Sequence, residues 1–189
     1  MDSPPAAMAF CQGCGESVET HRVVAEGRVE RRCVYCGLVL DARAAALTAV
    51  DRAIAVDDSP LLRDVLSDLL VERGLARVVT ACRDGSEFLE AFTESLVKRR
   101  PPGFMVLDVQ MPIINGIHAA LGARAIERGF AHPAIPIVFF SVAKCDENFR
   151  GVLRHCAPAG YLNKDTAPTP DAIGDRLSAI LRRMTLKQA

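Results

Sequence analysis

The sequence predicts an α/β protein built on a doubly wound, five-stranded parallel sheet, with a small β-type unit at its N-terminus. Strand-like and helix-like segments alternate five times after residue 52, which is typical of parallel βαβ units. Four cysteines in two close pairs precede an alanine-rich stretch at 42–51. Of the 189 residues, 50% are hydrophobic, enough for one ordinary domain and a small appendage. We therefore divide the chain into an N-terminal unit (1–41), a connector (42–51) and an α/β domain (52–185).

The predicted elements of the α/β domain follow one another in a simple order. The first strand covers 53–56, and Ser59 then caps a helix with Pro60 in its first position, where the missing N–H costs nothing. The third strand, at 104–107, is almost entirely apolar, as expected for a parallel strand buried on both faces. The remaining strands are expected at 77–82, 135–140 and 161–162, and the helices at 60–74, 86–98, 116–128, 149–156 and 173–184.

Charge and hydropathy argue against two classes of partner. The chain has 23 Lys+Arg and 23 Asp+Glu, so it has no global field that would attract nucleic acid or an acidic membrane. No apolar run approaches the roughly 20 residues of a membrane span. The first residues also lack the basic segment and apolar run of an export signal. We therefore expect a cytoplasmic protein with no membrane partner.

Polar residues follow four of the five predicted strands, where an open parallel sheet binds its ligands. Asp57 and Asp58 follow the first strand, Asp108 the third, Ser141 the fourth and Lys164 the fifth. Two carboxylates about 4 Å apart repel by roughly 4 kcal/mol at an effective dielectric constant near 20, so a cation is needed. Oxygen ligands favour a hard ion such as Mg²⁺, and the lysine and serine suit a phosphoryl group. The pattern predicts phosphoryl transfer with a carboxylate nucleophile.

These residues, in this order, resemble the receiver domains of two-component response regulators, which have a flavodoxin-like fold. The matching strings are AVDDS (55–59), VLDVQMP (106–112), FFSVAK (139–144) and GYLNKD (160–165). The resemblance implies that Asp108 is the phosphoacceptor and that Mg²⁺ is bound by Asp57, Asp58, Asp108 and the backbone carbonyl of Gln110. A phosphatase of the haloacid-dehalogenase type is disfavoured, because it would carry both acids in one D-x-D motif after a single strand.

The resemblance also implies a switch and a set of partners. Ser141 and Lys164 would contact the phosphoryl group, and Ser141 and Tyr161 would move when it arrives. The donor would be a histidine kinase or a phosphotransfer protein, and the surface around the fourth helix, fifth strand and fifth helix would change its preference for a downstream protein. The protein would be no enzyme beyond its own phosphorylation and dephosphorylation. Because little sequence follows the fifth helix, we expect output through the N-terminal unit, a separate partner or a homodimer.

Two positions depart from the family pattern. Asp165 stands where a proline usually follows the lysine, with a cis peptide bond between them. A cis bond to a non-proline residue would cost about 3 kcal/mol, so this loop is expected to differ. Val142 stands where alanine or glycine is usual, and we expect its bulk to slow the formation or decay of the phosphorylated state. A phosphorylation-independent pseudo-receiver scaffold is the alternative function.

The paired cysteines of the N-terminal unit predict a structural zinc ribbon. Eighteen residues separate the two C-x₂-C pairs, which is a known spacing for four thiolate ligands, and a glycine follows each pair. About 40 residues cannot build a self-sufficient core, whereas structural zinc contributes on the order of 10–16 kcal/mol. A hairpin is expected near 23–29, and His21 is left outside the ligand set. The predicted ligands are Cys11, Cys14, Cys33 and Cys36.

The stretch CVYCGLVLD (33–41) is similar to the second knuckle of the zinc ribbon in general transcription initiation factors of the B type. That resemblance implies only that such a ribbon can dock on RNA polymerase, nucleic acid or another protein. Residues 1–49 hold five arginines and no lysine against six acids, so protein contact is favoured over autonomous nucleic-acid binding. Arg28, Arg31 and Arg32 are the residues to test for an adaptor that binds polymerase or nucleic acid.

Overall fold

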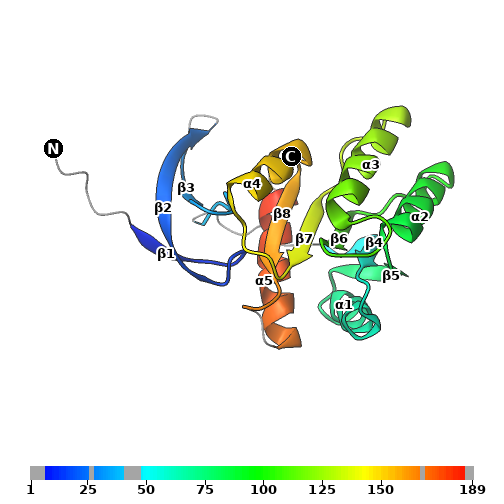
Figure 1. Cartoon of the computed structure of the whole chain (residues 1–189), viewed down its shortest axis with the longest axis horizontal. Helices are drawn as coiled ribbons and strands as arrows, with labels where there is room; N and C mark the ends of the chain where they lie inside the picture. Colours follow the sequence, from blue (N-terminus) through cyan, green and yellow to red (C-terminus); the bar gives the residue numbers. More distant parts are fainter. Residues whose placement is uncertain (1–6, 26–27, 41–47, 167–168, 186–189) are drawn as a thin grey trace.

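The computed structural model describes residues 7–25, 28–40, 48–166 and 169–185 and contains two separate sheets (Figure 1). The N-terminal sheet is antiparallel with the strand order β1-β2-β3, and the second sheet has the order β5-β4-β6-β7-β8. All neighbouring strands of the second sheet are parallel. No helix in the described part of the chain combines the length and apolarity needed to cross a bilayer.

The N-terminal sheet extends beyond the predicted hairpin. It comprises β1 (Met8–Cys11), β2 (Glu16–Ala25) and β3 (Arg28–Cys33). The hairpin of β2 and β3 runs in register as far as the pair Ala25 and Arg28, and the predicted turn at 26–27 lies outside the described residues. The sequence reasoning missed β1, a four-residue strand that pairs with the start of β2. Of the N-terminal unit, the structure describes residues 7–25 and 28–40.

The second sheet is doubly wound, as predicted. Its strands are β4 (Val50–Val56), β5 (Ala76–Cys82), β6 (Phe104–Asp108), β7 (Ile137–Ser141) and β8 (Ala159–Asn163). The helices are α1 (Pro60–Glu72), α2 (Gly85–Val97), α3 (Gly116–Gly129), α4 (Glu147–His155) and α5 (Pro170–Thr185). Ser59 caps α1 and accepts from the Leu62 amide, as the sequence indicates.

Several boundaries differ from the prediction, and three of them have a clear local reason. β4 begins at Val50, inside the predicted connector, because the Val50 amide donates to the Leu75 carbonyl and Val50 pairs with Ala76. Residues 42–47 of the connector lie outside the described residues. β7 begins at Ile137 rather than 135, after a proline that has no N–H for the ladder. α2 begins at Gly85 rather than 86, because Asp84 caps it and accepts from the Ser86 and Glu87 amides.

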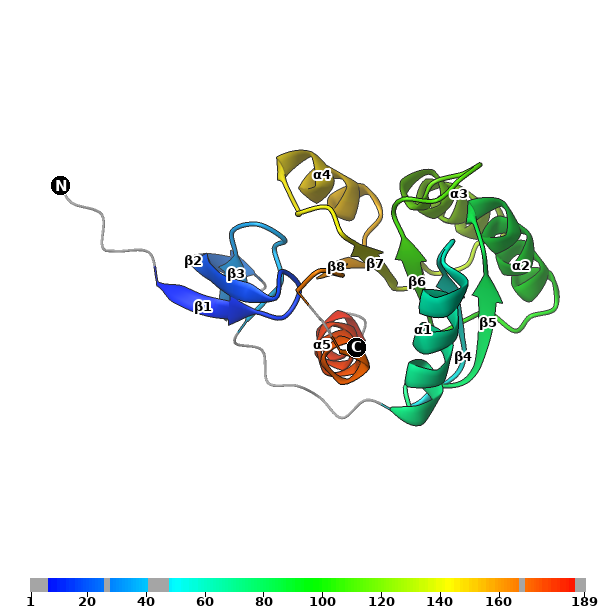
Figure 2. The same ribbon diagram turned by 60° about the horizontal axis from the view of Figure 1, so that its bottom comes forward.

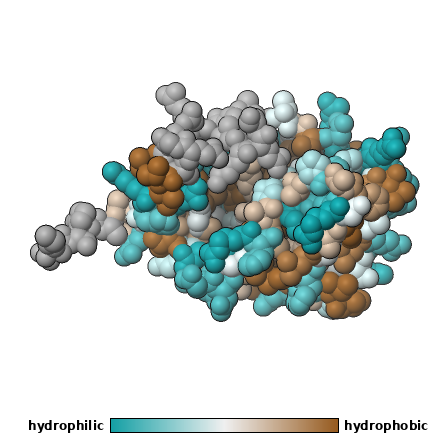
Figure 3. All heavy atoms as spheres, turned by 90° about the horizontal axis from the view of Figure 1, so that it is seen from above, coloured by the Kyte–Doolittle hydropathy of each residue, from teal (hydrophilic) through white to brown (hydrophobic). Residues whose placement is uncertain are grey.

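The helices cover the parallel sheet in two layers, and each layer has its own core (Figure 2). α1 and α5 pack on one face, over a cluster that includes Val106, Phe140 and Leu177. α2, α3 and α4 cover the other face, over a cluster that includes Phe88 and Phe139. In Figure 3, the hydrophobic residues on the face shown form small patches between hydrophilic ones.

The N-terminal unit packs against the β8 end of the parallel sheet, beside α4 and α5 (Figures 1 and 2). Its buried residues Cys11, Val18 and Cys33 belong to the same apolar cluster as Phe149 of α4 and Tyr161 of β8. The sequence left open whether this unit contacts the α/β domain. The shared cluster shows that it does.

Candidate functional site

Three carboxylates lie at the carboxyl ends of two neighbouring strands. β4 and β6 are paired in parallel, so Asp57 and Asp58 after β4 meet Asp108 at the end of β6. Their carboxylate oxygens all lie within 4.8 Å of one another. Asp57 and Asp108 are buried, whereas Asp58 is exposed. The structure therefore brings together the three acids that the sequence assigned to one site.

Lys164 reaches the same carboxylates from the loop after β8. Its Nζ lies 2.7 Å from Asp57 Oδ2 and 3.0 Å from Asp108 Oδ1. The ammonium also lies 5.0 Å from the centre of the Phe140 ring, which attracts a cation through its negative face. Both ion pairs are largely buried, so solvent screens them little. We call the set of Asp57, Asp58, Asp108 and Lys164 the acidic pocket.

The acidic pocket keeps an excess of negative charge. Burial raises the pKa of Asp108, and this exceeds the opposing effect of its hydrogen bond and charge interaction with Lys164. The backbone N–H of Gln110 donates to the same carboxylate. Three carboxylates against one ammonium, all oxygen donors, fit a hard divalent cation such as Mg²⁺. The metal-binding role of the Gln110 carbonyl stays a prediction.

The two predicted switch residues lie on neighbouring strands beside this pocket. Ser141 is fully buried at the end of β7, and its Oγ accepts from the Ala143 amide at 3.1 Å. Tyr161 on β8 is also buried, and its hydroxyl donates to the Ala143 carbonyl and accepts from the Asn163 side chain. Its ring packs edge-on against Phe149 of α4. Both predicted switch residues therefore contact the loop between β7 and α4.

The two departures from the family pattern lie in ordinary conformations. Within the described residues, the cis peptide bond is the one between Ala157 and Pro158, so the bond from Lys164 to Asp165 is trans. The Lys164 amide donates to the Ser141 carbonyl at 2.9 Å, which ties this loop to the end of β7. Val142 directly follows β7 and is 43% exposed rather than buried in the core.

The four predicted zinc ligands form a second cluster, in the N-terminal unit. Their sulphur atoms all lie within 4.8 Å of one another, with Cys11 and Cys36 3.5 Å apart and Cys14 and Cys33 3.8 Å apart. Sulphurs bound tetrahedrally at about 2.3 Å from one ion would be about 3.8 Å apart. Hydrogen bonds among the four sulphurs lower the pKa of Cys33 and raise the pKa of Cys14 and Cys36, as expected where neighbouring thiols share protons. Spacing and chemistry both suit one Zn²⁺.

Two matching loops present these sulphurs. In the first knuckle, residues 11–15, the Gly15 amide donates to the Cys11 carbonyl, and in the second, residues 33–37, the Gly37 amide donates to the Cys33 carbonyl. Both glycines have a positive φ, near 76° and 72°, which favours glycine over other residues. The sequence predicted these turns from the glycine after each cysteine pair. His21 is exposed on β2 and is not part of the cluster.

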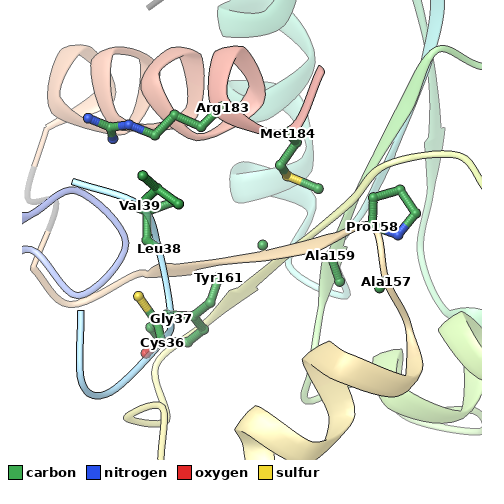
Figure 4. A pocket seen from close by; sticks show the side chains of 11 residues that line it. Cys36, Gly37, Leu38, Val39, Ala157, Pro158, Ala159, Tyr161, Arg183 and Met184 are labelled. Atoms are coloured by element: carbon green, nitrogen blue, oxygen red, sulfur yellow. The ribbon is translucent and has the colours of Figure 1, made fainter. Parts of the chain in front are cut away.

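The sequence did not reveal which residues join the N-terminal unit to the α/β domain. Arg150 of α4 donates to the Val34 carbonyl at 2.6 Å, and Asn163, Thr166 and Arg176 bind the first knuckle. A cavity of about 410 Å³ separates the second knuckle from β8 and the end of α5 (Figure 4). Figure 4 places Cys36 to Val39 on one side of it and Ala159 and Met184 on the other. These contacts join residues more than 110 positions apart, so local sequence patterns do not predict them.

Comparison with known proteins identifies one region of the chain. The response regulator receiver domain family matches residues 53–172. A protein-glutamate methylesterase/protein-glutamine glutaminase of Haloarcula marismortui is 38% identical over 97 residues, or 51% of this chain and 23% of that protein. One of Methanococcus maripaludis is 41% identical over 68 residues, covering 36% and 17%. The chain thus spans less than a quarter of the length of these relatives.

Solved structures share the fold. The receiver domain of the histidine kinase CKI1 from Arabidopsis thaliana, complexed with Mg²⁺, has a TM-score of 0.60 at 23% identity, covering 72% of this chain and 92% of that one. The response regulator domain of Thermotoga maritima CheB has a TM-score of 0.55 at 24% identity, covering 72% and 97%. At these identities the likeness concerns the fold alone.

Proposed function

The chain belongs to the response regulator receiver domain family, and from that premise we propose that Asp108 accepts a phosphoryl group from a histidine kinase or a phosphotransfer protein. The observation that carries the proposal is the acidic pocket. A buried carboxylate at a strand end faces a lysine 3.0 Å away and a buried serine on the neighbouring strand. The proposal does not extend to the methylesterase activity named for the relatives, because the match covers less than a quarter of their length.

The residues of the pocket suit the transfer in distinct ways. A carboxylate oxygen of Asp108 attacks the phosphorus as the bond from phosphorus to the donor breaks, and an acyl phosphate forms. The Lys164 ammonium can then pair with a phosphoryl oxygen instead of the Asp108 carboxylate, and the Ser141 hydroxyl can donate a hydrogen bond to a second phosphoryl oxygen. Asp57, Asp58, Asp108 and the Gln110 carbonyl would hold Mg²⁺, which offsets phosphoryl charge when bound.

Phosphodonor labelling tests this proposal. The full chain, incubated with Mg²⁺ and a small phosphodonor such as acetyl phosphate, should gain one acid-stable, base-labile phosphoryl group by mass spectrometry. Asp108→Asn should abolish the label, whereas Asp64→Asn, an exposed acid on α1, should keep it. A label that survives in Asp108→Asn would overturn Asp108 as the acceptor. A wild-type chain that neither takes the label nor binds beryllofluoride would favour the pseudo-receiver scaffold.

We also propose that Cys11, Cys14, Cys33 and Cys36 bind one structural Zn²⁺ that holds the two knuckles together. Four sulphurs at tetrahedral spacing support this, as does the absence of any disulfide among the described residues. Purified protein should contain one zinc per chain by elemental analysis. Cys33→Ser should lose it, and Cys82→Ser, which alters a buried thiol of the α/β domain, should retain it.

The outer surface of the N-terminal unit fits a protein partner better than nucleic acid. Arg32, one of the arginines that would carry nucleic-acid binding, forms an ion pair with Glu30 at 2.6 Å. Met8 and Phe10 of β1 are more than half exposed, and apolar side chains of that size favour protein contact. The Arg28 side chain lies outside the described residues. Salt-dependent nucleic-acid binding that disappears in Arg32→Ala would reverse this preference.

A further inference from the structure

Arg176 of α5 is a buried arginine whose hydrogen bonds are directed at the first knuckle. Its Nε donates to the Gln12 carbonyl, its Nη2 donates to the Gly13 carbonyl at 2.7 Å, and its Nη1 donates to Thr166 Oγ1 at 2.9 Å. The residue is only 5% exposed. A guanidinium buried to this extent needs acceptors for its charge, and backbone carbonyls of the cysteine loop supply them.

The segment 163–166, after β8, contacts the first knuckle and the acidic pocket at once. The Asn163 amide donates to the Gly13 carbonyl at 2.9 Å, and Thr166 Oγ1 donates to the Cys14 carbonyl at 2.9 Å. Lys164, between them, points its ammonium at the acceptor carboxylate, 3.0 Å away. Four consecutive residues therefore join a proposed zinc ligand to the proposed phosphoacceptor.

The contact between the knuckle and β8 leaves little freedom for either partner. A Cβ added to Gly13 would lie 2.7 Å from the Tyr161 carbonyl oxygen, closer than real Cβ atoms approach. The knuckle backbone thus lies directly against the strand that leads into the segment. Close-packed interiors transmit displacement rather than absorb it. A shift of the knuckle must therefore displace the segment that carries Lys164.

We propose that Arg176 and Thr166 are positioning residues that couple zinc retention in the N-terminal unit to phosphoryl binding at Asp108. The inference rests on the proposed function and extends it, because neither site alone requires the other. With zinc bound, the first knuckle is fixed and holds the 163–166 segment with Lys164 aimed at the pocket. This preorganisation strengthens binding of a phosphoryl group, and by linkage the phosphoryl group strengthens retention of zinc by the same factor.

Zinc release from the full chain measures this coupling. The rate of zinc transfer to a chromophoric chelator is followed with and without beryllofluoride and Mg²⁺, and the affinity for beryllofluoride is measured by calorimetry on zinc-loaded and zinc-free protein. We expect beryllofluoride to slow zinc release about fivefold or more, and zinc removal to weaken beryllofluoride binding about fivefold or more. Hydrogen exchange at the Asn163 amide should slow in the doubly loaded protein.

Matched variants separate coupling from simple loss of stability. In Thr166→Val and Arg176→Met, beryllofluoride should leave the rate of zinc release almost unchanged. In Arg176→Lys, it should again slow zinc release, but less than in wild type. Two controls should keep the wild-type factor: Thr93→Val, whose hydroxyl bonds only within α2, and Arg73→Met, whose ion pairs join α1 to α5 away from the knuckle.

The outcomes distinguish this inference from the proposed function. If wild-type protein binds both zinc and beryllofluoride but neither changes the other, the coupling is wrong. Faster zinc release with beryllofluoride, or full coupling in both Thr166→Val and Arg176→Met, also overturns it. If the protein binds no zinc or no beryllofluoride, the proposed function itself fails, and the coupling is overturned along with it.

Discussion

Replacing Lys164 by Met removes the cation that pairs with two buried carboxylates, Asp57 and Asp108. The lysine side chain is only 12% exposed, so its contribution is not much reduced by solvent. Loss of one partner from a buried ion pair typically costs about 3–5 kcal/mol. The carboxylates left behind would repel by about 4 kcal/mol at 4 Å and an effective dielectric constant of 20, which is consistent with that range. We therefore expect the free energy of unfolding to fall by about 3–5 kcal/mol at pH 7.5 without added Mg²⁺.

The cost of this substitution should depend on pH in a defined direction. Burial already raises the pKa of Asp108, and loss of the lysine removes contacts that lower it. A carboxyl whose pKa is higher in the folded than in the unfolded state contributes stability below its unfolded pKa, and this is lost as the pH rises through the folded pKa. The difference between Lys164→Met and wild type should therefore shrink as the pH falls from 7.5 toward 5.

Urea denaturation followed by circular dichroism measures both effects. Added Mg²⁺ should recover part of the stability lost in Lys164→Met, because it supplies positive charge to the same oxygens. The control is Lys98→Met, whose lysine is 62% exposed and pairs with Glu94 on the surface of α2. That control should cost about 0.3–0.5 kcal/mol or less. A cost for Lys164→Met below about 1 kcal/mol, or one that is unchanged at pH 5, would refute the reasoning.

Three further predictions concern other parts of the α/β domain. Burial raises the pKa of both Cys82 and Cys145 to about 12, so in the folded protein both should resist iodoacetamide at pH 8; labelling as fast as in urea, by mass spectrometry, would contradict this. Glu127→Ala should lower the free energy of unfolding by about 3–5 kcal/mol in urea titrations, because it leaves Arg124 charged and buried; a loss under about 1 kcal/mol would be inconsistent with the buried pair. Val142→Ala should speed formation or decay of phospho-Asp108, measured from timed labelling, and two unchanged rates would remove steric bulk as the cause.

The acidic pocket could be predicted from the sequence because it depends on a rule that holds for the whole sheet. Each buried strand reads as an apolar run that stops at a polar residue, and parallel strands bring these stops to one edge. Asp57, Asp108 and Lys164 were therefore placed together before any distance was known. The cysteine cluster could also be predicted from the sequence, because two C-x₂-C pairs at this spacing are typical of a four-thiolate site.

The start of β4 and the seat of the N-terminal unit could not be predicted in the same way. Val50 is only partly buried and its neighbour Asp51 is exposed, so the local pattern does not indicate a strand. Val50 belongs to β4 because it pairs with Ala76 of β5. Arg176 bonds to Gly13 across 163 positions. In the sequence of α5, Arg176 looks like an exposed arginine, because the helical pattern does not reveal that the first knuckle packs against this position.

If the knuckles bind zinc as proposed, the position of the N-terminal unit beside β8 has a consequence for a chain that loses this metal. β8 is an edge strand, and exposed strand edges are templates for pairing between copies. The first knuckle takes up the Asn163 amide and lies against the Tyr161 carbonyl, so it shields this edge. Departure of the knuckle would uncover the edge together with apolar side chains such as Phe149. Metal starvation should therefore turn this protein into a substrate for aggregation and for the chaperones and proteases that act on exposed strands.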